Sequence, residues 1–231
     1  MRSLPLAIAL AASFAQPALS RPAEGGQAEG DKVLFEEKFQ KKLSDGWTWL
    51  REDKKAWKLS DGALEIRALP GSLREKGNDA KNVLLRKPPA AGTEDEPFAI
   101  EATVKNAPAQ AGEQAGVILY QDDDNYVSLV REHKGGKIFV RMIREREGEE
   151  TVWAERQLEG ESHGLRLLHL GNKIQAEVKM GTPPMWMPAY YGEPPFKGAV
   201  KAGLVAWGAP AAAERWAKFT DVRFVKPEGR R

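Results

Sequence analysis

The stretch QAGVILYQDDDNYVSLVR, residues 114–131, decides the fold class of this chain. Two apolar runs, residues 117–120 and 126–130, flank the polar segment 122–125, which reads DDDN. β-Branched, aromatic and aliphatic side chains suit the half-buried surface of a sheet. Asp and Asn favour turns because their side chains hydrogen-bond to nearby backbone groups. The stretch therefore predicts a β-hairpin.

The same pattern continues along the chain on both sides of this hairpin. Asp61-Gly62 separates two short apolar runs, and such a pair favours a tight hairpin turn because Gly tolerates a positive φ. Further strands are expected at residues 57–59, 63–66, 83–85, 98–105, 138–143, 151–157, 165–170, 173–178, 200–207 and 216–225. Many short strands joined by turns predict an all-β fold, with two antiparallel sheets stacked as a jelly-roll sandwich.

Length and composition are those of one globular domain. The chain has 231 residues, of which 42% are hydrophobic and 29% charged. The formal net charge of +2, without a basic stripe, argues against nucleic acid as a partner. Cysteine is absent, so no disulfide forms. The fold must then rest on its core alone.

The N-terminal residues are those of an export signal. A basic start, a short apolar run at residues 4–15 and small residues before position 20 are typical of a cleaved signal peptide. We expect a signal peptide at 1–20, a disordered spacer at 21–30, the sandwich at 31–226 and a tail at 227–231. The mature chain is expected to have no membrane span and to be secreted or periplasmic. An uncleaved anchor is the alternative.

Several motifs together resemble one known superfamily. They are WKLSDGALEI at 57–66, NVLLR at 82–86, FAIEATV at 98–104, QAGVILYQDDDNY at 114–126, GLRL at 164–167 and AGLVA at 202–206. This series resembles the concanavalin A-like jelly-roll domains. It is most similar to DUF1349-type domains and to the C-terminal β-sandwich of family 43 β-xylosidases. The resemblance covers most of residues 31–226 and implies a carbohydrate context.

The chain differs from that family in two places. We expect the sandwich to act without an attached catalytic domain. Where relatives often carry a short turn, residues 181–196 read GTPPMWMPAYYGEPPF, which predicts a long loop rich in Pro and aromatic residues.

The sequence offers little for catalysis. The E-x-D-x-x-E signature of active jelly-roll glucanases is absent. Glu145 and Glu147 lie at alternate positions, but the charged segment 144–150 predicts a solvated hairpin tip, where water levels carboxyl pKa values. His133 and His163 are expected at the surface, His169 partly buried, and no zinc motif joins them. A glycoside-active hydrolase, as in a related superfamily that includes keto-sugar disaccharide hydrolases, stays an alternative.

Calcium is the one cofactor for which residues can be named. Some jelly-roll sugar modules bind calcium between the first and last strands, and the resemblance places Glu37 and Asp221 there. The acidic turn 122–125 also supplies the oxygen ligands that calcium prefers. A solvated turn explains the same residues.

The aromatic residues carry the functional hypothesis, because Trp and Tyr rings complement the apolar faces of sugars. We expect Trp57, Trp153, Trp207 and Trp216 in the core. The candidate ligand-binding residues are Trp47 and Trp49 beside a groove, Tyr120, Tyr126, Arg131 and Arg141 on the concave sheet, and Trp186, Tyr190 and Tyr191 on the Pro-rich loop. The sequence thus predicts an exported, non-catalytic carbohydrate-binding sandwich. A structural or protein-interaction envelope domain is the further alternative.

Overall fold

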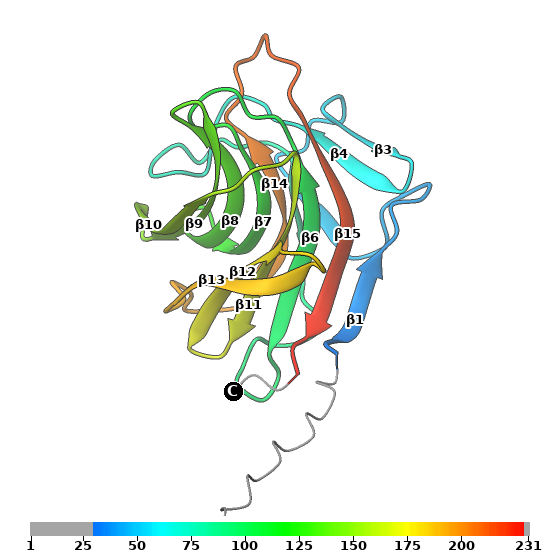
Figure 1. The fold of residues 1–231 in the computed structure, drawn as a ribbon, viewed down its shortest axis with the longest axis vertical. Coiled ribbons are helices and arrows are strands. Elements are labelled where there is room, and N and C mark those ends of the chain that lie inside the picture. Colours follow the sequence, from blue (N-terminus) through cyan, green and yellow to red (C-terminus); the bar gives the residue numbers. More distant parts are fainter. Residues whose placement is uncertain (1–29, 229–231) are drawn as a thin grey trace, which may run out of the picture.

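The computed structural model describes residues 30–228. The expected signal peptide, nearly all of the spacer and residues 229–231 of the tail lie outside this range. Within it the chain forms fifteen β-strands and no α-helix, arranged as two antiparallel sheets packed face to face (Figure 1). The prediction of a two-sheet, all-β sandwich is confirmed. Among these residues no helix is long and apolar enough to cross a membrane.

The first sheet has eight strands in the order β13-β12-β11-β6-β15-β4-β3, with β1 paired to β15. It joins strands from both ends of the described chain, because β1 runs antiparallel to β15 with Glu37 opposite Val222. Its members are β1 (Lys32–Glu37), β3 (Trp57–Ser60), β4 (Ala63–Arg67), β6 (Phe98–Lys105), β11 (Ser162–Leu170), β12 (Lys173–Met180), β13 (Met185–Gly192) and β15 (Trp216–Lys226).

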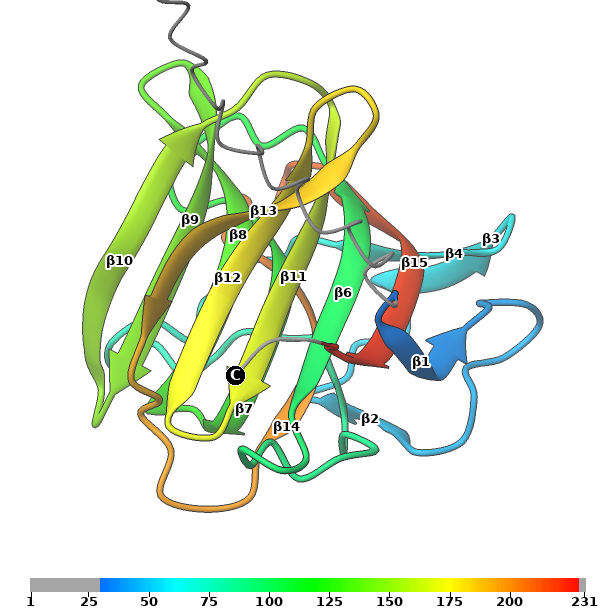
Figure 2. The ribbon, with the colours of Figure 1, turned by 60° about the horizontal axis from the view of Figure 1, so that its bottom comes forward.

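The second sheet has seven strands in the order β10-β9-β8-β7-β14-β5-β2. Figure 2 shows its strands β10 and β9 on the left, beside β12 of the first sheet. Its members are β2 (Trp47–Leu50), β5 (Val83–Arg86), β7 (Gln114–Asp122), β8 (Asn125–Lys134), β9 (Lys137–Arg146), β10 (Glu149–Gln157) and β14 (Lys201–Trp207).

The hairpin of residues 114–131 is β7 and β8. Tyr120 lies opposite Tyr126 and Asp122 opposite Asn125, so the turn itself is only Asp123-Asp124. The Asp122 carboxylate accepts hydrogen bonds from the Asp124 N–H at 3.1 Å and the Asn125 side-chain amide at 2.8 Å. These local bonds explain why the acidic segment forms a turn.

The main core fills the space between the sheets. Alternate residues of each strand point inward, and those from the first sheet, such as Ile100 and Phe219, pack against Val117, Leu129 and Leu204 from the second. All five side chains have at most 1% of their surface exposed. Burial of each contributes about 1.5–3 kcal/mol to stability, so this core stabilises the fold without disulfides.

A second apolar cluster lies on the outer face of the seven-stranded sheet. Leu73 and Ala80, from the connection between β4 and β5, cover Ile118, Tyr126 and Trp207 there. The same connection is tied down by polar contacts. Asn78 donates to Asp124 at 2.8 Å, Arg74 pairs with Glu150, and Arg51, which follows β2, donates to the Ala80 carbonyl at 2.7 Å.

Two segments differ from the sequence-based expectation. The Pro-rich stretch 181–196 is not wholly a loop, because it contains β13, which pairs with β12 as the edge strand of the first sheet. The charged tip 144–150 is also shorter than expected. β9 and β10 continue through it to a two-residue turn at Glu147-Gly148, where both residues have positive φ.

Candidate functional site at the sheet edge

The open side of the sandwich between β10 and β13 carries a stack of planar side chains. The Arg144 guanidinium lies 5.1 Å from the centre of the Trp153 ring, and Trp153 lies 5.9 Å from Tyr190. Tyr191 stacks on Tyr190 at 6.1 Å, with 23° between the ring planes. In Figure 2 the C-terminal end of β13 lies between β12 and β10, so the stack joins the edges of the two sheets.

Irregular pairing builds this stack. The register of β9 and β10 shifts between Val152 and Ala154, so Trp153 and Ala154 both pack toward the main core although they are consecutive. A second shift, between Ala176 and Glu177 of β12, sets the position of Tyr190 on β13. The last residue of β13, Gly192, lies against the Trp153 ring, where an added Cβ would come within 2.8 Å.

A cleft of about 300 Å³ opens beside the stack. Its floor is apolar and comes from the inner faces of both sheets, and its rim holds Glu155 and Arg156 of β10. The floor and wall residues are Leu129, Val140, Met142, Ala154, Val178, Pro188 and Ala189. This volume lies at the lower end of the range of small-molecule sites.

Tyr190 and Tyr191 are the accessible rings of this edge. Their side chains are 40% and 69% exposed, and Met185 and Met187 of the same strand are exposed as well. Trp186, on the same strand, is packed elsewhere. Its ring lies 4.2 Å from the Arg166 guanidinium and 5.6 Å from the Lys179 ammonium, outside the stack.

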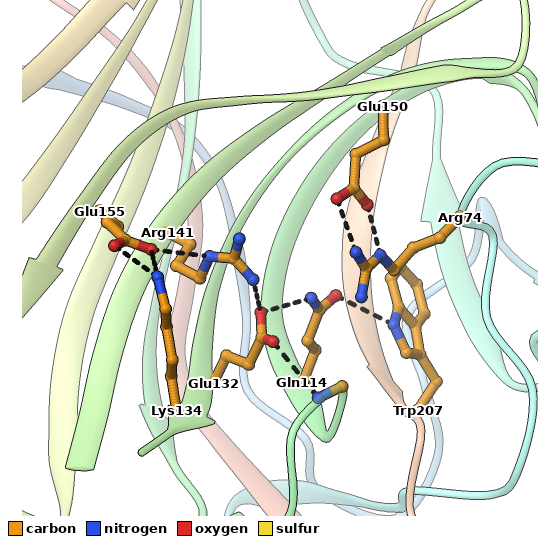
Figure 3. Close-up of polar contacts among 9 residues, drawn as sticks. Arg74, Gln114, Glu132, Lys134, Arg141, Glu150, Glu155 and Trp207 are labelled. Atoms are coloured by element: carbon orange, nitrogen blue, oxygen red, sulfur yellow. Dashed lines mark hydrogen bonds and ion pairs between the residues drawn. The ribbon is translucent and has the colours of Figure 1, made fainter.

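A polar network crosses the outer face of the seven-stranded sheet (Figure 3). The Trp207 indole donates to Gln114 at 3.0 Å, Gln114 donates to Glu132 at 2.7 Å, and Arg141 pairs with Glu132. The chain of contacts ends at Lys134 and Glu155, 2.7 Å apart near the strand edge. Gln114, Glu132 and Trp207 are at most 3% exposed and Arg141 is 9% exposed. The network therefore orders this face more than it offers a surface to a ligand.

The burial of Glu145 contradicts the expectation of a solvated acidic tip. Its side chain has no exposed surface and accepts a hydrogen bond from the Tyr126 hydroxyl at 2.9 Å. Burial raises the pKa of Glu145 to about 7. Glu147, in the turn, instead forms an exposed ion pair with Lys197 at 2.8 Å, which lowers its pKa. The two carboxylates are therefore not a matched catalytic pair.

Three of the four residues predicted on one sheet face lie together, and one does not. Tyr120, Tyr126 and Arg141 project from the outer face of the seven-stranded sheet, as part of its packing. Arg131 points the other way, because it occupies the opposite parity of β8, and donates to Asn106 at 2.7 Å. It also contacts His163, which is only 9% exposed and not the surface residue expected. Burial lowers the pKa of Arg131 to about 10.

The tryptophans of β2 belong to the packing between the sheets. Trp47 and Trp49 lie on one side of the strand, as predicted, and both contact the main core. Trp49 packs against Trp57 with ring centres 4.9 Å apart, and the Trp47 indole donates to Glu37 at 2.8 Å. The predicted core position of Trp207 is confirmed, whereas Trp57, Trp153 and Trp216 are only half-buried at the edges of the sandwich.

The residues named for calcium have other partners. The Glu37 carboxylate accepts hydrogen bonds from the backbone N–H groups of Phe39 and Ser44, both at 3.0 Å, as well as from Trp47. Asp221 is exposed and accepts from the Thr220 hydroxyl. Between residues 30 and 228 no three side chains of His, Asp or Glu converge as a metal site would need. The bonds of Glu37 are those of a structural cap.

Sequence reasoning named Tyr190 and Tyr191 but missed the rest of the edge. The sequence predicts Trp153 in the core, Arg144 in a solvated hairpin tip and Arg156 in a strand, with none of the three at a binding site. The register shift that turns Trp153 toward β13 leaves no mark in the residue pattern. The one signal that the sequence offers is the high content of aromatic residues and Pro in residues 181–196.

Comparison with known proteins identifies the family of this chain and solved structures with a similar fold. The family model described as the β-xylosidase C-terminal concanavalin A-like domain matches residues 36–224. The comparison with curated protein sequences finds no match. Among solved structures, the GH43 protein BlXynB from Bacillus licheniformis has a TM-score of 0.72 and 17% identity, covering 82% of this chain and 39% of that one.

Two further structures share the fold. A Bacteroides ovatus protein described as xyloglucan PUL GH43B has a TM-score of 0.70 and 18% identity, with 93% of this chain and 42% of that chain covered. A functionally unknown protein from Saccharomyces cerevisiae has a TM-score of 0.63 and 14% identity, with 80% and 98% covered. The chain thus spans about two-fifths of the two GH43 proteins. The family match over residues 36–224 shows that the chain belongs to the β-xylosidase C-terminal concanavalin A-like domains.

Proposed function

We propose that this chain is an exported, non-catalytic domain that binds carbohydrate at the edge between β10 and β13. The observation that carries the proposal is the stacked, exposed pair Tyr190 and Tyr191. Sugars present flat C–H faces that pack on aromatic rings, and a phenol adds a hydrogen-bonding group. Two exposed aromatic rings are unfavourably hydrated in the free protein. Contact with the apolar face of a sugar removes this water and therefore favours binding.

The other aromatic candidates support this narrower site by exclusion. Trp47, Trp49, Tyr120 and Tyr126 are engaged in packing or in hydrogen bonds of the fold. The cleft beside Tyr190 provides a recess next to the exposed rings. Membership of a family named for β-xylosidases supports a carbohydrate ligand, although the chain covers only part of the GH43 proteins it resembles.

The non-catalytic and exported parts of the proposal rest on separate residues. Glu145, the carboxyl with a raised pKa, is fully buried and cannot reach a substrate. Export rests on the signal-like residues 1–20. Expression in a bacterium followed by mass measurement of the mature protein tests it, with cleavage after Ser20 as the expected result.

Binding is tested by affinity electrophoresis through polysaccharide gels, followed by calorimetry with oligosaccharides of the retained type. We expect dissociation constants between about 10 µM and 1 mM, because two stacked rings supply only a few kcal/mol. Tyr191→Ala and Tyr190→Ala should abolish retention. Met185→Ala, on the same strand but outside the stack, is the matched control and should bind normally. Retention that survives both tyrosine changes, or no retention on any polysaccharide, contradicts the proposal.

A further inference from the structure

Three arginines surround the aromatic stack without a carboxylate partner. Arg144 and Arg146 occupy the inward parity of β9, the same as Met142, and Arg156 lines the cleft from β10. Within residues 30–228, none of the three forms an ion pair. Of the buried arginines elsewhere, Arg141 and Arg166 pair with glutamates, whereas Arg131 donates to Asn106. At the stack, three arginines therefore lie close together without an ion pair among the described residues.

The surroundings of Arg144 show this most clearly. Its guanidinium lies over Trp153 and donates to the Thr151 hydroxyl at 3.3 Å, while its Nε is buried without a partner. Burial and the neighbouring charge of Arg146 both lower the pKa of Arg144, which the charge of Glu193 only partly offsets. A bound anion would supply a counter-charge to this guanidinium.

Among the described residues, no nearby carboxylate forms an ion pair with these arginines. Glu155 lies at the rim of the cleft, but Lys134 holds both of its oxygens, at 2.7 and 2.8 Å, and Arg141 approaches it at 3.5 Å. Glu193 is exposed and forms no ion pair among the described residues. The guanidinium of Arg146 donates to the Pro194 carbonyl at 3.0 Å, which holds it beside the end of β13.

We propose that the ligand of this edge site is an acidic saccharide, whose rings stack on Tyr190 and Tyr191 while its carboxylates pair with Arg144, Arg146 and Arg156. This inference rests on the proposed carbohydrate binding and names the class of sugar. Guanidinium groups bind carboxylates through paired, charge-assisted hydrogen bonds, and planar Arg over Trp fixes the direction of the fork. A neutral sugar would bring no counter-charge to these three cations.

The test compares ligands that differ only in charge. Oligogalacturonate is titrated calorimetrically against the mature protein at about 20 and 300 mM NaCl, beside its methyl ester and a neutral oligosaccharide of equal length. We expect the free acid to bind at least ten-fold more tightly than its ester at low salt. Most of this difference should disappear at high salt.

Substitutions of single residues test which side chains cause the tighter binding of the acid. Arg156→Gln and Arg144→Gln should each weaken binding of the acid about five- to ten-fold, a clearly larger loss than either causes for the ester. Arg156→Lys should restore part of the loss, which a merely structural role would not predict. Lys41→Gln removes an exposed cation on the distant β1–β2 connection and is the charge-matched control. Thermal unfolding confirms that each variant is folded.

The outcomes separate the two proposals. Equal affinity for acid, ester and neutral sugar overturns the acidic class but leaves carbohydrate binding intact. Absence of binding to every saccharide overturns both. Tighter binding of an oligothymidylate of equal charge also overturns the inference, because stacked rings with arginines can bind single-stranded nucleic acid.

Discussion

The side chain of Glu145 links one residue to the pH response of the fold. It lies on the outer face of β9 without exposed surface, and its carboxyl pKa is raised from 4.5 to about 7 by burial. A raised pKa means that the folded state disfavours the charged form. The stability contributed by the neutral carboxyl is complete below about pH 4.5 and is lost as the pH rises through about 7.

Replacing Glu145 by Gln should therefore remove a pH-dependent loss of stability. We expect Glu145→Gln to be about 2–3 kcal/mol more stable relative to wild type at pH 8.5 than at pH 4.5, since each pKa unit corresponds to about 1.4 kcal/mol. Urea unfolding of both proteins across this pH range measures it. Glu147→Gln, in the exposed turn, is the control. Parallel pH profiles for wild type and Glu145→Gln would contradict the raised pKa.

Some residue positions were predictable from parity alone. Tyr126 and Arg131 are five residues apart on one strand, so they must face opposite sides of the sheet. The sequence-based grouping overlooked this, whereas the pairing of Tyr120 with Tyr126 follows directly from the hairpin. The burial of Glu145 could not be predicted, because it depends on the distant connection between β4 and β5 covering that face.

At the scale of elements, the sequence predicts the hairpins but not the edge strand β13. Asp61-Gly62 and Gly171-Asn172 form the expected two-residue turns. Strand β6 has the predicted bounds, since its alternation of large apolar residues is regular. Strand β13 escaped prediction because Pro188 and several exposed apolar residues disguise a strand that is paired on only one side.

The end of β13 offers a test of the stack as one element. A Cβ added to Gly192 would come within 2.8–2.9 Å of three atoms of the Trp153 ring, which must then move. We expect Gly192→Ala to change the tryptophan emission and to reduce saccharide retention several-fold. The free energy of unfolding should fall by only about 1–2 kcal/mol, because Trp153 is half-buried at the edge.

Gly198→Ala serves as the control for this change, because an added Cβ there meets nothing within 4 Å. Fluorescence spectra, gel retention and urea unfolding are measured on both variants. Normal retention in Gly192→Ala together with an altered Trp153 environment would show that Tyr190 and Tyr191 do not depend on the ring behind them.

At the scale of the whole molecule, one core joins the two sheets. Phe219 of β15 is fully buried and packs in the same cluster as Val117 of β7, from the opposite sheet. The two halves of the sandwich therefore share their apolar burial, and neither sheet has a separate core large enough to be stable alone. The small cluster beneath the β4–β5 connection adds to the seven-stranded sheet without forming a second domain.

Cooperative unfolding should follow from this shared core. We expect Phe219→Ala, a change in the eight-stranded sheet, to destabilise the protein by about 3–5 kcal/mol. Amide hydrogen exchange in the presence of low urea should then accelerate equally in β6 and in β7, because both sheets open in one transition. Val33→Ala, at an exposed position of β1, should leave both rates unchanged. Acceleration confined to the eight-stranded sheet would mean that the seven-stranded sheet, held by its outer polar network and second cluster, retains structure on its own.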